Sequence, residues 1–290
     1  MKKYIILIPI YNDRQSLTKL IENINIEAKH LKFEISIIVV NDASSQKIID
    51  DYQNIENINS IEIINMKDNR GHARCIASGL KYIFEKKEFD YVIPMDGDGE
   101  DRPEEIKNFI GHADQIDNKT KIGVRTKRSE TLFFKICYEL HKILTLVFTG
   151  QSIKFGNFTC LSKPTIEKML NEKATWNSFS GSLKKTEKDL LSILSIRGKR
   201  YFGPSKMSFF NLLKHSLSII SVFKTTLLIR SILFLIAYLF LIAGKISLIT
   251  LIPVIAVTIM VISVITLSRR ENMSEFNNSL ENIEHIDKIK

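Results

Sequence analysis

Cysteine and histidine are scarce in this chain, and the few that occur form no recognisable disulfide or metal pattern. The three cysteines are widely spaced, at Cys75, Cys137 and Cys160, and none of the six histidines has metal-ligand spacing. Such a set is neither a disulfide framework nor a zinc motif. The absences argue against a disulfide-stabilised secreted fold and indicate reduced thiols in the cytosol. Met1-Lys2-Lys3 leads into a short apolar run with no cleavage-site pattern, so no signal peptide is predicted.

Three nucleotide- and ion-binding motifs are also absent. Gly97 and Gly99 do not begin a dinucleotide-binding fingerprint, because Arg102 stands where its third glycine belongs, and the Gly-Lys-Ser/Thr of a phosphate loop does not occur. A calcium loop starting at Asp96 fails, because Asp101 replaces its glycine and Lys107 its closing glutamate. The acidic loop therefore needs another explanation.

Positive charge exceeds negative charge, with 41 basic and 32 acidic residues and a formal net charge of +9. No recognised nucleic-acid motif accompanies this excess, so nucleic acid is not an expected partner. The charge instead favours an anionic membrane leaflet.

The first hundred residues alternate β-branched runs with helical patterns, which is typical of βαβ units and a parallel sheet. The apolar residues of two segments, 17–31 and 73–84, recur at helical spacing. The runs predicted as strands, apolar on nearly every residue as in strands covered on both faces, are 4–10, 34–40, 60–64 and 90–95. The sequence predicts an α/β domain with a mostly parallel sheet flanked by helices.

Polar residues gather at the carboxyl ends of these strands, with Asp13 after the first, Asp42 after the second, and Asp96 and Asp98 after the fourth. Ligands of open α/β sheets bind at that edge. Magnesium-like ions bind through one or two carboxylates together with substrate phosphates and water. We therefore expect Asp96 and Asp98 to hold a metal on a phosphorylated ligand. The plain alternative is a surface turn that binds nothing.

The last third of the chain is apolar. Residues 246–267 form 22 consecutive residues without a charge, long enough to cross a bilayer as a helix. Residues 227–243 are shorter and carry Arg230, which we expect to snorkel to the interface. Gly244-Lys245 links the two segments into a predicted hairpin, and the alternative is a pair of core helices in a soluble domain.

Basic residues flank both sides of this hairpin, so the positive-inside rule places the rest of the chain in the cytoplasm. The expected location is the inner (cytoplasmic) membrane, with a multi-pass anchor. Ahead of the hairpin, apolar and polar residues alternate between Phe209 and Lys224, which suits a helix lying in the membrane interface. A core helix is the alternative.

Seven short motifs, in this order and spacing, resemble the inverting nucleotide-sugar glycosyltransferases of GT-A fold and family 2. Within that family they are similar to the polyprenyl-phosphate glycosyltransferases, such as dolichol-phosphate mannose synthase and GtrB-type enzymes. The resemblance runs from residue 4 to about residue 224. The motifs are Ile8-Pro9-Ile10-Tyr11-Asn12-Asp13, Val39-Val40-Asn41-Asp42-Ala43-Ser44, Asn69-Arg70-Gly71, Asp96-Gly97-Asp98, Gly123-Val124-Arg125 with Arg128, Gly156-Asn157-Phe158, and Arg200 with Gly203-Pro204-Ser205-Lys206.

The resemblance implies a role for each of these positions. Mg2+ or Mn2+ would be held by Asp96 and Asp98, and the catalytic residues would be Asp98, Glu100 and Arg125. The implied nucleotide-sugar ligands are Pro9, Tyr11, Asn12, Asp42, Arg70, Gly71 and Asp96, with Asp42 accepting a hydrogen bond from the base. The implied acceptor-phosphate ligands are Arg125, Arg128, Arg200, Ser205 and Lys206.

Two departures from the family pattern bear on the sugar and the nucleotide rather than on the reaction class. Asn41 stands where a first Asp is common, and Glu100 stands where dolichol-type members often have Gln. No general base is assigned, and the candidates nearest in sequence are Asp98 and Glu100 of the metal loop.

The expected function is transfer of a sugar from a nucleotide-diphosphate sugar, with a UDP-sugar favoured, to a polyprenyl (undecaprenyl) phosphate on the cytoplasmic leaflet. One alternative is a different lipid or glycan acceptor. A processive polysaccharide synthase is disfavoured because Trp176, the single tryptophan, lacks the preceding arginine of the Gln-x-x-Arg-Trp motif. A non-catalytic membrane scaffold with a degenerate transferase domain is the other alternative.

We expect a catalytic domain over 1–206, an amphipathic helix over 207–225, two transmembrane helices over 226–268 and a polar tail over 269–290. Residues 133–149 are predicted as an amphipathic helix and 155–161 as a strand. A mobile polar loop over the site is predicted for 176–183, and the tail after Glu271 is expected to fray or to form a short helix. Related hairpin-anchored enzymes suggest a homo-oligomer, either a dimer or a tetramer.

Overall fold

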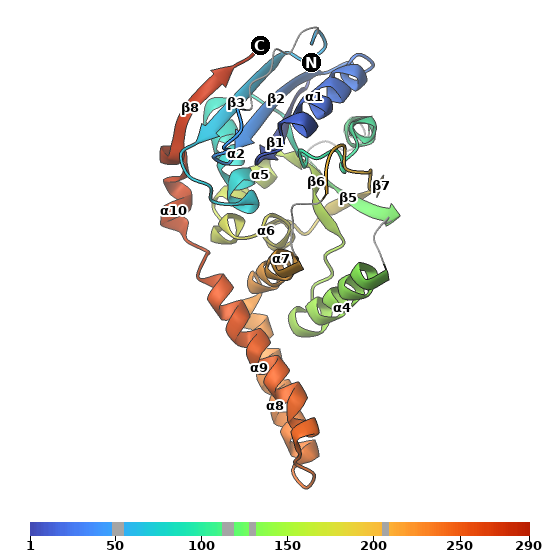
Figure 1. Cartoon of the computed structure of the whole chain (residues 1–290), viewed down its shortest axis with the longest axis vertical. Helices are drawn as coiled ribbons and strands as arrows, with labels where there is room; N and C mark the ends of the chain where they lie inside the picture. Colours follow the sequence, from blue (N-terminus) through green and yellow to red (C-terminus); the bar gives the residue numbers. More distant parts are fainter. Residues whose placement is uncertain (48–54, 112–118, 128–131, 205–208) are drawn as a thin grey trace.

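A computed structural model describes residues 1–47, 55–111, 119–127, 132–204 and 209–290. Its centre is an eight-stranded sheet in the order β7-β5-β6-β4-β1-β2-β3-β8, from which a helical hairpin projects (Figure 1). Only β6 and β8 run against their neighbours, while the other pairings are parallel. The expected α/β fold with a mostly parallel sheet is confirmed.

The four predicted strands are confirmed with shifts of one or two residues at their ends. They are β1 (Lys3–Ile10), β2 (Glu34–Asn41), β3 (Ser60–Met66) and β4 (Tyr91–Pro94). The strand predicted at 155–161 is β6 (Phe155–Ser162). The strands without a specific prediction are β5 (Thr120–Lys127), β7 (Leu190–Ile196) and β8 (Ile283–Lys288).

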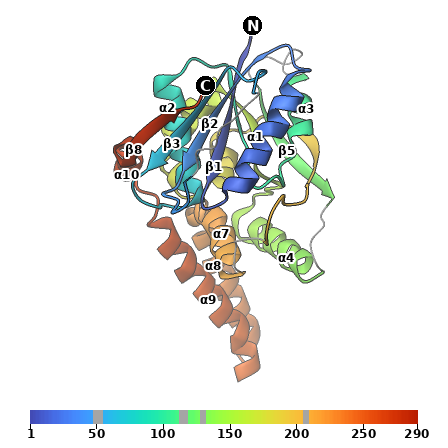
Figure 2. The ribbon, with the colours of Figure 1, turned by 45° about the horizontal axis from the view of Figure 1, so that its top comes forward.

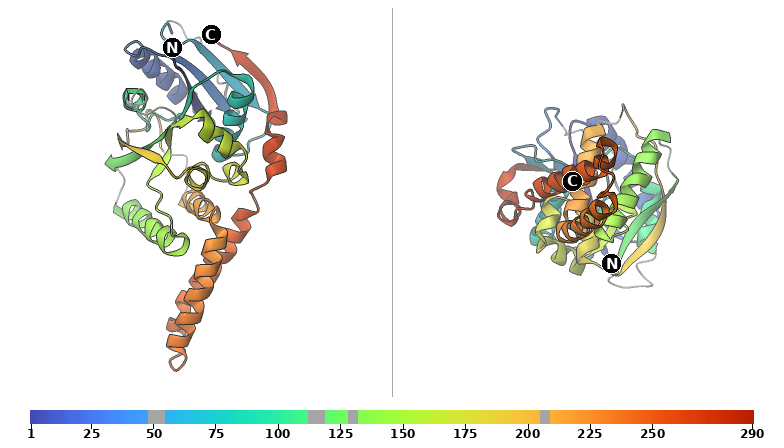
Figure 3. Two further views of the ribbon diagram at one scale, coloured as in Figure 1. Left: turned by 180° about the vertical axis from the view of Figure 1, so that it is seen from behind. Right: turned by 90° about the horizontal axis from the view of Figure 1, so that it is seen from below.

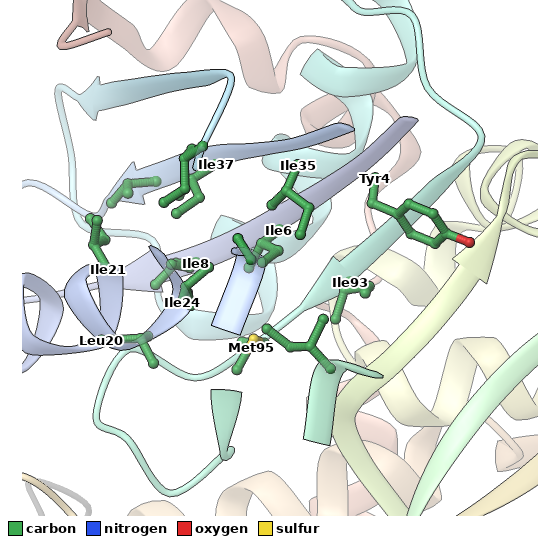
Figure 4. Close-up of a cluster of buried hydrophobic side chains, with 14 of the residues drawn as sticks. Tyr4, Ile6, Ile8, Leu20, Ile21, Ile24, Ile35, Ile37, Ile93 and Met95 are labelled. Atoms are coloured by element: carbon green, nitrogen blue, oxygen red, sulfur yellow. The ribbon is translucent and has the colours of Figure 1, made fainter. Parts of the chain in front are cut away.

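Two helices cover opposite faces of the parallel strands. On one face, α1 (Arg14–Ala28) packs on alternate residues of β1 such as Ile6 and Ile8 (Figure 4). On the other face, α2 (His72–Lys86) packs on the residues between them, such as Leu7. Both faces of β1 are therefore buried, which explains why its sequence is continuously apolar instead of alternating.

The remaining helices connect the second half of the sheet and form the hairpin. Those before the hairpin are η1 (Pro103–Glu105), α3 (Ile106–Gly111), α4 (Leu132–Thr149), α5 (Lys163–Leu170), η2 (Lys173–Trp176), α6 (Phe179–Thr186) and α7 (Phe209–Ser221). The hairpin and the segment after it contain α8 (Lys224–Ile242), α9 (Leu248–Ser268), α10 (Met273–Asn277) and η3 (Ser279–Asn282).

The mobile loop predicted over 176–183 is wrong. Trp176 ends η2 and is fully buried, and Phe179 to Leu183 begin α6 with every side chain buried. The error arose because serines dominate this stretch. Their hydroxyl groups have internal partners: Ser178 caps α6, and Ser182 hydrogen-bonds Thr175 at 2.6 Å.

The tail after Glu271, expected to fray or to form a short helix, does form a short helix but is more ordered than expected. It forms α10, η3 and the antiparallel edge strand β8, which pairs with β3 from Met66↔Ile283 to Glu62↔Lys288. Phe276 of α10 stacks on Trp176 at 5.5 Å between ring centroids, and Glu275 accepts the indole N–H at 2.9 Å. This return to the sheet was missed because its packed apolar residues, such as Phe276, Ile283 and Ile286, stand singly in a polar sequence.

Two consecutive helices, α8 with 19 residues and α9 with 21, are long and apolar enough to cross a membrane. They project from the domain as a hairpin, and most of their large apolar side chains are exposed (Figure 1). The alternative of core helices in a soluble domain is therefore not supported, because a core helix would be buried. Only their roots share a small apolar cluster, which includes Phe148, Ile220 and Leu227.

The helices α4 and α7 lie beside the root of the hairpin (Figure 3). Both confirm predicted helices, and both carry exposed apolar residues, such as Ile143 on α4 and Phe210 on α7. Arg230, which we expect to snorkel to the interface, lies at the root of the hairpin and is exposed. Its guanidinium donates to the carbonyl oxygens of Leu146 and Val147 at the end of α4, at 3.3 and 2.8 Å, and so caps that helix.

The Trp176–Phe276 contact predicts that the C-terminal segment stabilises the whole domain. Phe276→Ala removes a buried ring, and we expect it to lower the free energy of unfolding by about 3 kcal/mol. Denaturant unfolding in detergent, followed by fluorescence of the single tryptophan, measures the change. Ile26→Ala, at an exposed position of α1, is the matched control. Equal stability of the two variants would contradict the docking of α10.

Candidate functional site

The carboxyl ends of the parallel strands face the hairpin side of the molecule. The N-terminus, where β1 begins, lies at the end opposite the hairpin (Figures 1 and 2). The chain therefore leaves β1, β2, β3 and β4 towards the hairpin, and the polar loops predicted at that edge come together there.

The acidic loop after β4 is held by its own backbone and by one aromatic ring. The Asp96 N–H donates to Asp101 Oδ2 at 3.0 Å, and the Glu100 N–H donates to Asp98 Oδ1 at 3.0 Å. Gly99 adopts a left-handed backbone with φ of 86°, and a Cβ there would lie 2.4 Å from the Tyr201 ring. Glycine is therefore required for the loop to fold beneath this ring.

Asp96, the first predicted metal ligand, is contacted by two residues that sequence reasoning did not select. Its Oδ1 accepts from Asn157 Nδ2 at 3.1 Å and lies 3.2 Å from His72 Nε2. Burial alone would raise the pKa of Asp96, but His72, Asn157 and Arg125 hold it well below its usual range. Asn157 belongs to a quoted family motif, whereas only the position of His72 beside Gly71 gave a signal.

The imidazole of His72 shares this environment. Burial would lower the pKa of His72, but the Asp96 carboxylate, with Asp101 and Asp98 further away, raises it above its ordinary value. The first turn of α2 thus brings an imidazole, whose protonated form these carboxylates favour, against the acidic loop.

Asp98, the second predicted metal ligand, pairs with Arg200. Its Oδ2 accepts from Arg200 Nη1 at 2.9 Å, and the other nitrogen of the fork pairs with Asp13. Burial and the Asp96 carboxylate raise the pKa of Asp98, against the pull of the Glu100 N–H and Arg200. Asp13, from the loop after β1, is therefore part of the site, and Arg200 links it to the acidic loop.

Arg125 and Glu100, both expected to be catalytic, are also paired. Arg125 Nη2 donates to Asp101 Oδ1 at 3.2 Å, and Glu100 Oε2 accepts from Arg197 Nε at 2.7 Å. Burial and Asp96 raise the pKa of Asp101 to about 7, even though Arg125 lowers it. Three arginines thus form ion pairs with the acidic loop: Arg125 comes from β5, and Arg197 and Arg200 come from the segment after β7.

On the neighbouring strand, Asp42 fixes the loop that precedes α2. Its two carboxylate oxygens accept the backbone N–H groups of Arg70 at 2.8 Å and Gly71 at 2.9 Å. Asn69 donates to the Asp42 carbonyl at 3.1 Å. Three predicted nucleotide-sugar ligands, Asp42, Arg70 and Gly71, therefore form one hydrogen-bonded unit.

Asn12 ties the loops after β1 and β2 together. Its N–H donates to Ser44 Oγ at 2.8 Å, and its Oδ1 accepts the Ser45 N–H at 2.9 Å. The neighbouring Tyr11 ring is half exposed at the sheet edge, while Pro9 lies buried in β1 beside Val40. Of this predicted set, Tyr11 offers an open ring face on which a base can stack.

The carboxylates suit one divalent cation. No group of three or more histidine, cysteine or acidic side chains in the described part of the chain is arranged to hold a metal. A cation here would therefore be held by Asp96 and Asp98 together with phosphate oxygens of a ligand, which is the usual donor set of Mg2+. Arg128, Ser205 and Lys206, predicted as acceptor-phosphate ligands, lie outside the described residues.

Solved structures share the fold of this chain at low sequence identity. Glucosyl-3-phosphoglycerate synthase from Mycobacterium tuberculosis, in complex with Mn2+, uridine diphosphate and phosphoglyceric acid, has a TM-score of 0.53 and 13% identity over 78% of each chain. Mannosyl-3-phosphoglycerate synthase from Rubrobacter xylanophilus has a TM-score of 0.51 and 11% identity, over 76% of this chain and 72% of that chain. These likenesses support the GT-A fold.

Sequence relatives lie closer. The undecaprenyl-phosphate 4-deoxy-4-formamido-L-arabinose transferases of Photorhabdus laumondii and Proteus mirabilis are 30% and 28% identical to this chain. Each match covers 73% of this chain and 65% of the relative, so the chain spans about two thirds of their length.

The family model for glycosyl transferase family 2 matches residues 5–171, a range that contains most of β1, the whole of β2 to β6, and both Asp96 and Asp98. It covers more than half of the chain and agrees with the resemblance carried by the seven motifs. This chain belongs to glycosyl transferase family 2.

Proposed function

We propose that this protein transfers a sugar from a nucleotide-diphosphate sugar, with a UDP-sugar favoured, to a polyprenyl phosphate at the cytoplasmic face of a membrane. The observation that carries the proposal is the placement of the acidic loop and its arginines on the side of the domain that faces the apolar hairpin. The names of the relatives, which specify undecaprenyl phosphate, support the same acceptor class.

The donor half of the proposed site consists of the three loops after β1, β2 and β3 together with the acidic loop. The base would lie against Tyr11 and near Asp42, whose loop is already fixed by hydrogen bonds to Arg70 and Gly71. Asp96 and Asp98 would hold Mg2+ or Mn2+ on the diphosphate. When bound, the cation supplies positive charge that stabilises the departing nucleoside diphosphate.

The acceptor half needs cations rather than a strong base. A phosphomonoester has a second pKa of about 6 and is mostly dianionic at neutral pH. Its oxygen can attack the anomeric carbon directly, forming the new carbon–oxygen bond while the bond to the nucleoside diphosphate breaks. Arg200, whose fork already spans Asp98 and Asp13, is the described arginine best placed to orient that phosphate.

The membrane anchor would fix the position of the site relative to the bilayer. With α8 and α9 spanning the bilayer, the exposed apolar residues of α4 and α7 would lie in the interface on the same side. The site would then sit at the level of the lipid phosphate. Net positive charge on the chain would favour the anionic cytoplasmic leaflet of the inner membrane.

Asp98→Asn keeps the shape of the acidic loop and removes one charge. We expect it to reduce formation of glycolipid from radiolabelled nucleotide sugars and undecaprenyl phosphate on the order of 100-fold, because the leaving group loses its electrostatic support. Asp189→Asn, an exposed carboxylate far along the chain, is the matched control. Full activity of Asp98→Asn, or no lipid product from any nucleotide sugar with the parent protein, would contradict the proposal.

Nucleotide binding separates this enzyme from a non-catalytic scaffold. UDP or GDP at about 100 times its dissociation constant should stabilise the folded chain by about 2.7 kcal/mol, which appears as a higher thermal midpoint. A chelator should abolish the stabilisation, and Mg2+ or Mn2+ should restore it. A midpoint that neither nucleotide moves would favour the scaffold.

Arg200→Lys keeps the charge but loses the planar fork. We expect the KM for the lipid phosphate to rise about tenfold, while the KM for the donor changes little. Arg102→Lys, a partly exposed arginine paired with Glu104, is the control. A rise confined to the donor KM would assign Arg200 to the diphosphate instead of the acceptor.

A further inference from the structure

A chain of hydrogen bonds crosses three strands of the sheet, from the C-terminal strand to the loop at the proposed donor site. Asn65 Nδ2 of β3 donates to Asp287 Oδ2 of β8 at 2.8 Å. Asn41 Nδ2 of β2 donates to Asn65 Oδ1 at 2.8 Å, and the Ser44 N–H donates to Asn41 Oδ1 at 3.1 Å. The four groups thus form a continuous series.

The direction of this series is the same from both ends, because the Ser44 N–H only donates and the Asp287 carboxylate only accepts. An ionised carboxylate only accepts hydrogen bonds, so Asp287 requires Asn65 to turn its NH2 group towards β8. Asn65 then offers its carbonyl oxygen to Asn41, which must donate its own NH2 group and turn its oxygen towards Ser44. The acceptor on β8 and the donor at Ser44 therefore require the same orientation of the two amides between them.

Burial makes this orientation costly to lose. Asn41 is 6% exposed and Asn65 is 9% exposed, so water has little access to replace a missing partner. A buried amide left without its partner destabilises the folded protein by the full desolvation penalty of the unpaired group. The Asp287 carboxylate is also near His285 Nε2, at 3.4 Å, on the same strand.

The series ends on the loop that holds Asn12. Ser44 Oγ accepts the Asn12 N–H, and Asn12 adopts a left-handed backbone with φ of 51°. Ala43, beside Ser44, also has a positive φ, of 55°. Such conformations are unfavourable for residues other than glycine and persist only where neighbouring contacts hold them. In the sequence, Asp42 lies between Asn41 and Ala43.

We propose that Asp287 is a positioning residue for the nucleotide donor, acting through Asn65 and Asn41 on the loop of Asp42, Ser44 and Asn12. The strand that follows the apolar hairpin then forms part of the donor site, although it lies some 245 residues after Asn41 in the sequence. The proposal rests on the proposed function, because it assumes that this loop binds the nucleotide.

An exchange of charges between the two ends of the series tests its direction. Asn41→Asp places a carboxylate at each end, and Asn65 can then donate to only one while its oxygen faces the other. Asp287→Asn keeps an acceptor oxygen for Asn65, and its own effect on binding completes the double-mutant cycle. In the double variant Asn41→Asp/Asp287→Asn, Asn65 turns over and its bonds to residues 41 and 287 form again with donor and acceptor exchanged, while the Ser44 N–H still donates to residue 41. Both substitutions preserve side-chain shape.

The measurement is binding of UDP and GDP with Mn2+ to the full chain in detergent by calorimetry, with the thermal midpoint recorded for each variant. We expect Asn41→Asp to weaken binding about tenfold and the double variant to recover to within about threefold of the parent. If the losses of binding affinity in the two single variants simply add, with no recovery in the double variant, the proposal is overturned.

Asp287→Ala provides a second test that does not depend on Asn41. It should raise the donor KM about tenfold and leave kcat and the lipid KM unchanged, because only the donor loop loses its support. Glu284→Ala, an exposed carboxylate on the same strand, should behave like the parent. A fall in kcat alone, or equal effects of the two variants, would contradict the proposal.

The two proposals fail in different ways. A parent protein that binds neither nucleotide would overturn the proposed function and this inference with it. A parent that binds a nucleotide while the exchange of charges shows no recovery would overturn the inference alone.

Discussion

The arrangement of the site depends on the crowding of four carboxylates at one edge of the sheet. Asp13, Asp96, Asp98 and Asp101 come from loops that follow adjacent parallel strands, so the topology itself forces them together. Like charges at this distance are compatible with a folded domain only when cations and hydrogen-bond donors compensate them. The compensating groups, His72, Arg125 and Arg200, come from three other parts of the chain.

This compensation also explains how the two halves of the domain are joined. The parallel half supplies the carboxylates, whereas β5 and the segment after β7 supply the arginines. Substrates that carry a diphosphate and a phosphate bring additional negative charge to the same edge. A site rich in both signs can bind these anions by exchanging internal ion pairs for pairs with the ligand, which limits the desolvation cost of binding. The C-terminal strand completes the sheet behind this site.

The amino-acid sequence was sufficient to predict the first four strands and the acidic edge, because continuous apolar runs and the polar residues after them are local signals. The family resemblance implied that Asp42, Arg70 and Gly71 belong to one site, and these three residues form one hydrogen-bonded unit. The sequence did not reveal β8 or the buried Trp176 segment, because both depend on partners about 100 residues or more away, namely Phe276 and Glu275 for Trp176, and β3 for β8. His72 was missed because its partner Asp96 lies on a different loop of the sheet edge, and the contact of Arg230 with α4 could not be predicted because its acceptors are backbone carbonyls of a distant helix.

The most direct test of the account is the chemical identity of the product. The protein should be incubated in membranes with its nucleotide-sugar donor and undecaprenyl phosphate, and the extracted lipid analysed by mass spectrometry and NMR. The account predicts one sugar joined to the polyprenyl chain through a single phosphodiester, with an anomeric configuration opposite to that of the donor. A product without phosphate between sugar and lipid, or one that retains the donor configuration, would contradict it.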